Sequence, residues 1–156
     1  MSSTASNVDD TIIGHHLGKW GNWNDAAGNA AHARVFKYAN EAWSQYELDI
    51  DGDAAADQFG SAVLLSADGE RLAVGDSYND DGGNSAGHVR IFDEPSSSLS
   101  SWGQVGDDID GITQVNYGGD YFGDAVALSA DGSRVVIGVE GNDNAGSGDG
   151  TVRVYE

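Results

Sequence analysis

One phrase recurs in this chain of 156 residues and limits the folds open to it. Residues 59–75 (FGSAVLLSADGERLAVG) and residues 122–138 (FGDAVALSADGSRVVIG) align without a gap. The copies lie much too far apart for a helical or coiled-coil period. Repetition over such a distance is typical of chains built from successive copies of one supersecondary unit.

Each copy predicts a run of short antiparallel strands. In the later copy, FGDAVALS reads as a buried strand, the Asp-Gly of ADG as a tight turn, and RVVIG as a second strand. A loop rich in glycine and asparagine then leads to a third strand, TVRVY. The earlier copy runs in the same order to HVRIF, and residues 102–105 leave room for a fourth strand.

A third, partial copy opens the chain. Residues 10–14 (DTIIG) align with RLAVG and RVVIG, and residues 32–36 (HARVF) align with HVRIF and TVRVY. Later in each unit, AWSQ aligns with SWGQ, and both are followed by DIDG. The chain therefore contains three units, of which the first lacks most of its first strand.

Several side chains recur at fixed positions of the repeat. A phenylalanine opens the first strand and a tryptophan opens the fourth, so both types are expected to pack in the core of each unit. An arginine recurs in the third strand and is expected to pair with recurrent aspartates. These structural repeat positions are Phe59 and Phe122, Trp43 and Trp102, and Arg34, Arg90 and Arg153.

Four short antiparallel strands in a unit of about 50 to 65 residues predict an all-β fold made of β-propeller blades. A β-sandwich has a similar number of strands but does not require sequence repetition, so the repeat favours blades. The predicted units are a partial blade over residues 1–52, a complete blade over 53–111, and a blade without its fourth strand over 112–156. The sum is about two and a half blades, an incomplete ring.

The order of these motifs resembles the FG-GAP repeats of integrin-α-type β-propellers, in the short variant found in tandem in microbial and algal surface proteins. The resemblance covers nearly the whole chain after residue 10. It implies an extracellular or cell-surface scaffold for binding or adhesion, without catalytic activity. The calcium loop that such repeats carry between their first two strands is replaced here by SADGE and SADGS. One aspartate in each (Asp68, Asp131) is too few for a cation that takes 6 to 8 oxygen ligands.

An incomplete ring raises the question of what meets its ends. Propellers close with 4 to 8 blades, and unpaired sheet edges are templates for pairing with other chains. Three outcomes are open: assembly of copies into a ring or fibre, continuation within a longer propeller protein, or an arc capped by its own N-terminal residues. Self-association or pairing with another propeller segment is expected over a lone monomer.

A formal net charge of −19 bears on the possible partners. Nucleic-acid binding is not expected, because it requires lysine and arginine to neutralise phosphates. No stretch approaches the roughly 18 apolar residues of a membrane span, so membrane insertion is not expected either. The first ten residues show neither the basic nor the apolar region of a signal peptide.

One acidic segment fits part of a calcium loop. Asp49, Asp51, Asp53 and Asp57 occupy relative positions 1, 3, 5 and 9 of an EF-hand, but the Gly at 6 and the Glu at 12 are missing. Calcium is therefore a possible cofactor. The competing interpretation is a connector between blades in which the aspartates form turns.

The loops between the second and third strands are the other candidate sites. Exposed Trp and Asn side chains are suited to contact a sugar ring or a partner protein, and oxygen-rich loops to hold calcium. The same residue types also form Asx turns or pack against a neighbouring blade. The candidates for ligand or partner contact are Trp20, Trp23, Asn79, Asp80, Asp81, Asn142, Asp143 and Asn144. His15, His16 and His32 are possible transition-metal ligands, although His32 aligns with His88 and is expected to serve its strand.

Motifs of catalysis are missing from the sequence. It contains no G-x-S-x-G, no H-E-x-x-H, no phosphate-binding glycine loop that opens a helix, and no cysteine. We therefore expect a non-enzymatic surface module for protein interaction or self-assembly. The alternative is a calcium- or glycan-binding, lectin-like module that uses the loops of residues 15–32, 76–87 and 139–150.

Overall fold

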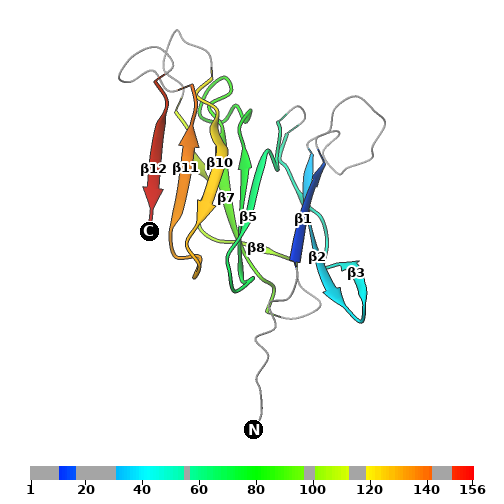
Figure 1. The fold of residues 1–156 in the computed structure, drawn as a ribbon. Coiled ribbons are helices and arrows are strands. Elements are labelled where there is room, and N and C mark those ends of the chain that lie inside the picture. The colour runs from blue at the N-terminus through cyan, green and yellow to red at the C-terminus, as the bar shows by residue number, and fades with distance from the viewer. Residues whose placement is uncertain (1–10, 17–30, 55–56, 97–100, 113–118, 142–148) are drawn as a thin grey trace.

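The computed structural model describes residues 11–16, 31–54, 57–96, 101–112, 119–141 and 149–156. Over these residues the fold is all-β, with twelve strands in three antiparallel sheets, none of which closes into a barrel. Figure 1 shows the sheets side by side in chain order. The described part of the chain has no helix that is long and apolar enough to cross a membrane.

Each sheet is formed by one stretch of the sequence. Sheet A contains β1 (Thr11–His16), β2 (His32–Ala39), β3 (Ala42–Gln45) and β4 (Ile50–Asp51). Sheet B contains β5 (Ala62–Leu65), β6 (Arg71–Asp76), β7 (His88–Asp93), β8 (Gly103–Gln104) and β9 (Ile109–Asp110). Sheet C contains β10 (Phe122–Leu128), β11 (Val135–Val139) and β12 (Thr151–Tyr155).

The strands predicted from the repeat are present in the predicted order. The fourth position is split into two short pieces, because β8 and β9 pair with opposite ends of β7, and β3 and β4 do the same with β2. The conserved geometry extends to register: Gly75 lies opposite Val89, and Gly138 lies opposite Val152. The three strands of sheet C therefore pair in the same register as β5, β6 and β7 of sheet B.

Strand β1 departs from this pattern. The alignment predicts that Gly14 faces Ala33, but Gly14 lies opposite Arg34, a shift of one residue. Strands β6 and β11 are each held between two partners, whereas β1 pairs only with β2 among the described strands.

The Asp-Gly turns are closed by their own side chains. Asp131 accepts hydrogen bonds from the Ser129 hydroxyl at 2.6 Å and from the backbone N–H of Ser133 at 3.1 Å, and Gly132 supplies a φ of 65°. These bonds hold the pKa of Asp131 down to about 2. The equivalent turn at Asp68 has the same serine contact. Both turns are thus closed by local contacts.

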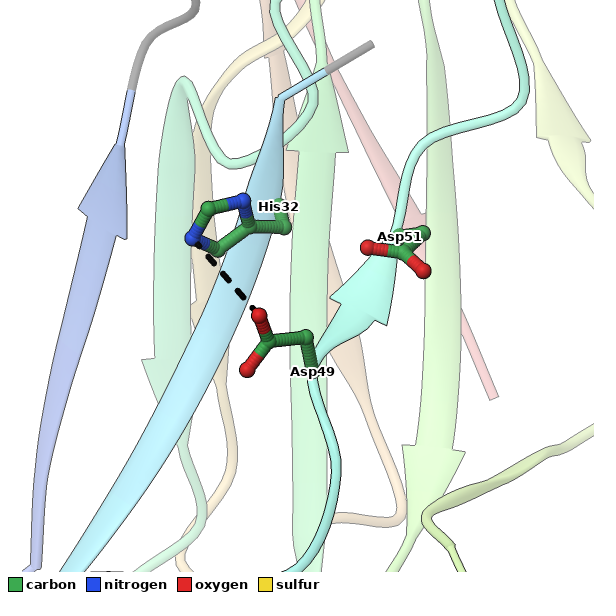
Figure 2. Close-up of side chains that lie close together, drawn as sticks. All are labelled: His32, Asp49 and Asp51. Atoms are coloured by element: carbon green, nitrogen blue, oxygen red, sulfur yellow. Dashed lines mark ion pairs between the residues drawn. The ribbon is translucent and has the colours of Figure 1, made fainter. Parts of the chain in front are cut away.

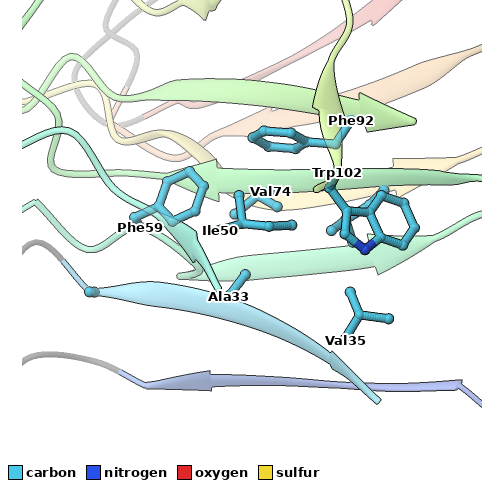
Figure 3. Packing of buried hydrophobic residues seen from close by; sticks show 9 residues of the cluster. Ala33, Val35, Ile50, Phe59, Val74, Phe92 and Trp102 are labelled. Carbon is cyan, nitrogen blue, oxygen red and sulfur yellow. The ribbon is translucent and has the colours of Figure 1, made fainter. Parts of the chain in front are cut away.

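Two apolar clusters join the three sheets. Alternate residues of a strand face opposite sides, so Leu72 and Val74 of β6 point toward sheet A while Ala73 points toward sheet C. Figure 3 shows the cluster between sheets A and B, where Trp102 lies near Val35. The second cluster, between sheets B and C, contains Ala73, Val89, Phe122, Val135, Ile137 and Val139.

The recurrent aromatic positions differ in burial. Phe59 and Phe122 are fully buried and Trp102 is only 6% exposed, as expected for core positions. Trp43 does not follow the expectation, since it is 44% exposed and contacts Tyr38 at a ring distance of 5.3 Å. Sheet A covers Trp102, but none of the described sheets covers the face of sheet A that carries Trp43.

Candidate functional site

The outer face of sheet C is an exposed apolar surface. Val136, Val152 and Val154 are 36%, 63% and 60% exposed. Val136 and Val154 are cross-strand partners, and Val152 lies opposite Gly138, so the three valines share one face. We call this surface the C face.

The equivalent surface of sheet B is covered. Register places Ala73 opposite Ile91 and Gly75 opposite Val89, which matches the C face position for position. Ala73 and Val89 are completely buried against sheet C, and Ile91 packs against the same cluster. The same structural positions are therefore core in one sheet and surface in the other.

Glycines mark where a neighbouring sheet comes close. A Cβ added at Gly75 would lie 2.1 Å from the carbonyl oxygen of Gly123, and one at Gly87 would lie 2.2 Å from that of Phe122. At the equivalent Gly138 the nearest atom is the Ala125 side chain, at 3.3 Å.

A hollow lies beside Gly138 on the C face. At the equivalent place in sheet B, beside Gly75, the backbone of sheet C fills the space. The volume of the hollow is about 570 Å³, and Gly138, Gly150 and Val152 are among its lining residues. The backbone of Phe122 and Gly123 lies against the equivalent Gly75 and Gly87. Among the described residues, the C face thus lacks the neighbouring backbone that its counterpart in sheet B contacts.

Sheet A presents a different apolar face at the other end. Phe36, Tyr38 and Trp43 lie on it, because the alternate residues Ala33 and Val35 point toward sheet B. Tyr38 and Trp43 are both more than 40% exposed. We call this surface the A face.

The predicted calcium segment does not form one site. Among the described groups, Asp49 and Asp51 cluster with His32, and Asp53 clusters with His88 and Asp108. Asp57 instead accepts a hydrogen bond from the buried Asn79 at 3.1 Å. The four aspartates are dispersed because the chain runs as strand β4 and then turns toward sheet B.

Figure 2 shows the first of these clusters. His32 Nε2 lies 4.0 Å from Asp49 Oδ2. Arg34 donates to both oxygens of Asp49 at 2.8 Å, and these bonds hold the pKa of Asp49 below its usual value. The Asp49 carboxylate is thereby neutralised by a bidentate pair.

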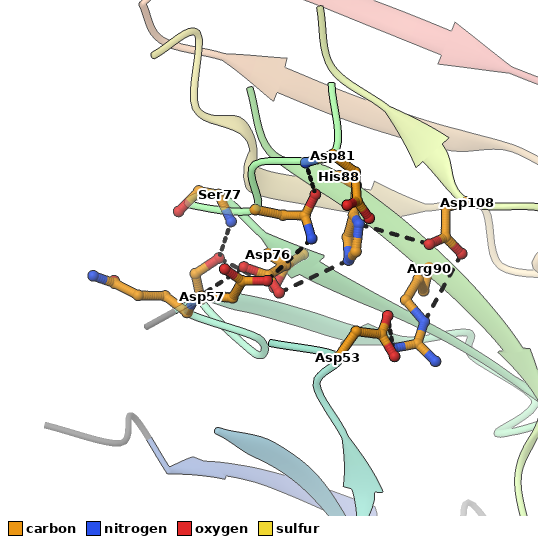
Figure 4. A network of polar contacts seen from close by, with 12 residues as sticks. Asp53, Asp57, Asp76, Ser77, Asp81, His88, Arg90 and Asp108 are labelled. Carbon is orange, nitrogen blue, oxygen red and sulfur yellow. Dashed lines mark hydrogen bonds and ion pairs between the residues drawn. The ribbon is translucent and has the colours of Figure 1, made fainter. Parts of the chain in front are cut away.

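The second cluster surrounds His88 (Figure 4). His88 is fully buried, with Nδ1 3.7 Å from Asp108 Oδ2 and Nε2 3.8 Å from Asp76 Oδ2. Asp76 is also fully buried, and burial, together with the charge of Asp57, raises its pKa to about 7. Burial lowers the pKa of His88, which favours the neutral imidazole.

The described loop candidates make internal contacts. The Asn79 side chain accepts from the backbone N–H of Asp81 at 2.9 Å, and Asp80 accepts from that of Ser85 at 2.8 Å. These are Asx-type turn contacts. Trp20, Trp23, Asn142, Asp143 and Asn144 lie outside the described residues, while His15 and His16 end strand β1.

The recurrent arginines lie beside acids or aromatic rings. Arg90 Nη1 donates to Asp53 at 3.0 Å, as Arg34 does to Asp49. Arg90 lies over the Phe59 ring at 5.1 Å, and Arg153 lies over the equivalent Phe122 at 5.5 Å. This second, cation–π role is not evident from the sequence.

Several residues of these sites escape sequence reasoning. Val152 and Val154 read as an ordinary strand, and only a comparison of burial between repeats distinguishes them. Asp76 lies opposite His88 in the β6–β7 register, and His88 lies opposite Asp110, two residues after Asp108. A register prediction for the aligned strands would have suggested this proximity.

Comparisons with known proteins add no relative. The chain matches no model of a known protein family, no curated protein and no solved structure.

Proposed function

We propose that this chain is a non-enzymatic interaction module of the β-propeller type, which assembles head to tail with a second copy of itself. The observation that carries the proposal is the C face, whose valines are exposed, while of their counterparts in sheet B two (Ala73 and Val89) are fully buried and one (Ile91) is partly buried under the next sheet. Burial of apolar area is the main driving force of such association.

The A face supplies the complementary surface. Within the chain, Phe92 and Trp102 of sheet B cover the inner face of sheet A. Phe36 and Trp43 hold the same repeat positions on the A face. A second copy can therefore dock its A face on the C face of the first, in the manner in which sheet B already covers sheet A.

Such a contact joins two different surfaces of the same chain. Contacts of this heterologous kind propagate, and they end in a closed ring or continue as a fibre. The three sheets of one copy would act as successive blades of the assembly. An extracellular or cell-surface location follows from the resemblance to FG-GAP repeats.

Light scattering over a series of protein concentrations tests the proposal. The wild-type chain is expected to show a mass above that of one chain, which falls on dilution. Val152→Asp places a charge in the contact and is expected to give the single-chain mass. Val105→Asp is the matched control, because Val105 is exposed outside both faces. A wild-type protein that stays monomeric at every concentration would overturn the proposal, and so would a Val152→Asp variant that assembles like Val105→Asp.

The lectin-like alternative has less support among the described residues. Asn79 is buried and Asp80 holds a turn, so neither side chain is presented to a ligand. Calorimetric titration with calcium and with a glycan panel tests this alternative, and it is sustained only if saturable heat appears.

A further inference from the structure

We propose that Asp53, His88 and Asp108 form a binding site for a divalent transition metal, with Zn²⁺ as the best match. One ligand atom of each residue lies within 4.8 Å of the other two. Bonds of about 2.0 to 2.2 Å around a tetrahedral zinc place two ligand atoms about 3.4 Å apart. The observed 3.7 Å between His88 Nδ1 and Asp108 Oδ2 is close to that separation.

The independent observation is the state of His88. Its ring is fully buried, and neither nitrogen has a hydrogen-bond partner among the described residues. A neutral imidazole carries one N–H and one lone pair, and burying both without partners is unfavourable. A cation bound at Nδ1 would accept the lone pair of that nitrogen. Only the N–H at Nε2 would then still need a partner.

Asp76 lies beside the second ring nitrogen of His88, Nε2. Its Oδ2 is buried, has no hydrogen-bond partner among the described residues, and lies 3.8 Å from His88 Nε2. Histidines that bind metals through one nitrogen commonly donate the other N–H to a carboxylate, which fixes the ring and its tautomer. Asp76, His88 and the proposed metal would form such a series.

The ligand types select the metal. Calcium and magnesium take oxygen ligands in greater number, whereas one imidazole with two carboxylates suits zinc. The site therefore differs from the possible calcium segment of Asp49, Asp51, Asp53 and Asp57, and shares only Asp53 with it.

The equivalent cluster of sheet A shows why the site is specific to sheet B. Arg34 occupies both oxygens of Asp49. In sheet B, Arg90 donates hydrogen bonds to Gln104 and Asp53, and its Nε comes only within 4.0 Å of Asp108 Oδ1. Gln104 donates to that same Oδ1, so that Oδ2 of Asp108 faces His88. A metal would compete with Arg90 for Asp53, which has a second oxygen to offer.

Calorimetric titration of the chelator-treated full chain with ZnCl₂ tests the inference, with CaCl₂ in parallel. We expect one Zn²⁺ per chain, and at least a tenfold weaker affinity in Asp108→Asn. Asp76→Asn, which contacts no metal, is expected to weaken binding ten- to a hundredfold. Asp49→Asn is the matched control at the equivalent position of sheet A and is expected to bind as the wild type does.

Circular dichroism confirms that each variant is folded. Cobalt supplies a second readout, since a tetrahedral Co²⁺ site absorbs strongly in the visible range and Asp108→Asn is expected to lose the band. The inference is wrong if zinc gives no saturable heat with the wild type. It is equally wrong if Asp49→Asn loses as much affinity as Asp108→Asn, because the binding would then reside in the acidic surface as a whole.

Discussion

The substitution of alanine for two equivalent glycines isolates the energetic role of a neighbouring sheet. Gly75 and Gly138 occupy the same position of the repeat and the same cross-strand register. Neither has a positive φ, so alanine introduces no backbone strain at either site. The two sites differ in one respect: sheet C covers Gly75, while Gly138 lies on the C face.

The distances give the expected magnitude. A Cβ at Gly75 would lie 2.1 Å from the Gly123 oxygen and 3.0 Å from its carbonyl carbon, so strand β10 must move by more than 1 Å. Overpacking against backbone costs about 1 to 3 kcal/mol, and this close approach puts Gly75→Ala at about 3 kcal/mol. Gly138→Ala meets only the Ala125 side chain at 3.3 Å, and alanine gains about 0.5 to 1 kcal/mol over glycine in a strand. We expect Gly138→Ala to be neutral or slightly stabilising.

Equilibrium unfolding in urea, at concentrations where light scattering finds single chains, measures both changes. The expected difference in the free energy of unfolding between the variants is about 3 kcal/mol. Equal destabilisation by the two substitutions would refute the reasoning, because the only difference invoked is the covering sheet. At high concentration Gly138→Ala is expected to weaken assembly without weakening the fold.

Two further predictions concern single side chains. Trp102→Ala is expected to lower the free energy of unfolding by about 3 to 5 kcal/mol, and Trp43→Ala by less than about 1 kcal/mol, because only Trp102 is buried. Urea unfolding of the single chain measures both changes. Similar losses in the two variants would contradict the difference in burial. The raised pKa of Asp76, about 7, means that the folded state keeps a proton that the unfolded state releases above about pH 4. The free energy of unfolding of the wild type relative to Asp76→Asn is therefore expected to fall as the pH rises from about 4 to about 8, by at most about 4 kcal/mol, and a constant difference over that range would count against it.

Much of the fold is predictable from the sequence, because each strand carries its own signal. Residues 122–138 contain a strand, an Asp-Gly turn and a second strand, and the structure has β10 and β11 in those places. Local patterns of this kind depend on neighbours within a few residues. The repeat then transfers the prediction to the less regular first unit.

The exposure of Trp43 depends on something that the repeat does not encode. The repeat gives Trp43 and Trp102 the same position, but burial requires a neighbouring sheet, and the described residues supply one only for Trp102.

The candidate sites are the least predictable part. The spacing of Asp49 to Asp57 fits part of a calcium loop, yet strand pairing at β4 sends their side chains to three different places. Asp76, His88 and Asp108 come from three separate segments, which only the pairing of β6, β7 and β9 brings together. Spacing along a chain predicts a site when one loop forms it, and fails when several strands do.

The position of sheet B between two neighbours has a consequence for how the molecule opens. In an array where units contact only their neighbours, the cost of opening a unit is its own stability plus the interfaces that it breaks. Opening sheet B breaks two interfaces, whereas opening sheet A or sheet C breaks one. Amide hydrogens of β6 and β7 are then the slowest to exchange with solvent, and opening begins at the ends of the array. A further copy docked at either end would add an interface to the terminal sheet and slow its opening. Amide hydrogens in the middle of a long assembly would then exchange more slowly than those of a single chain.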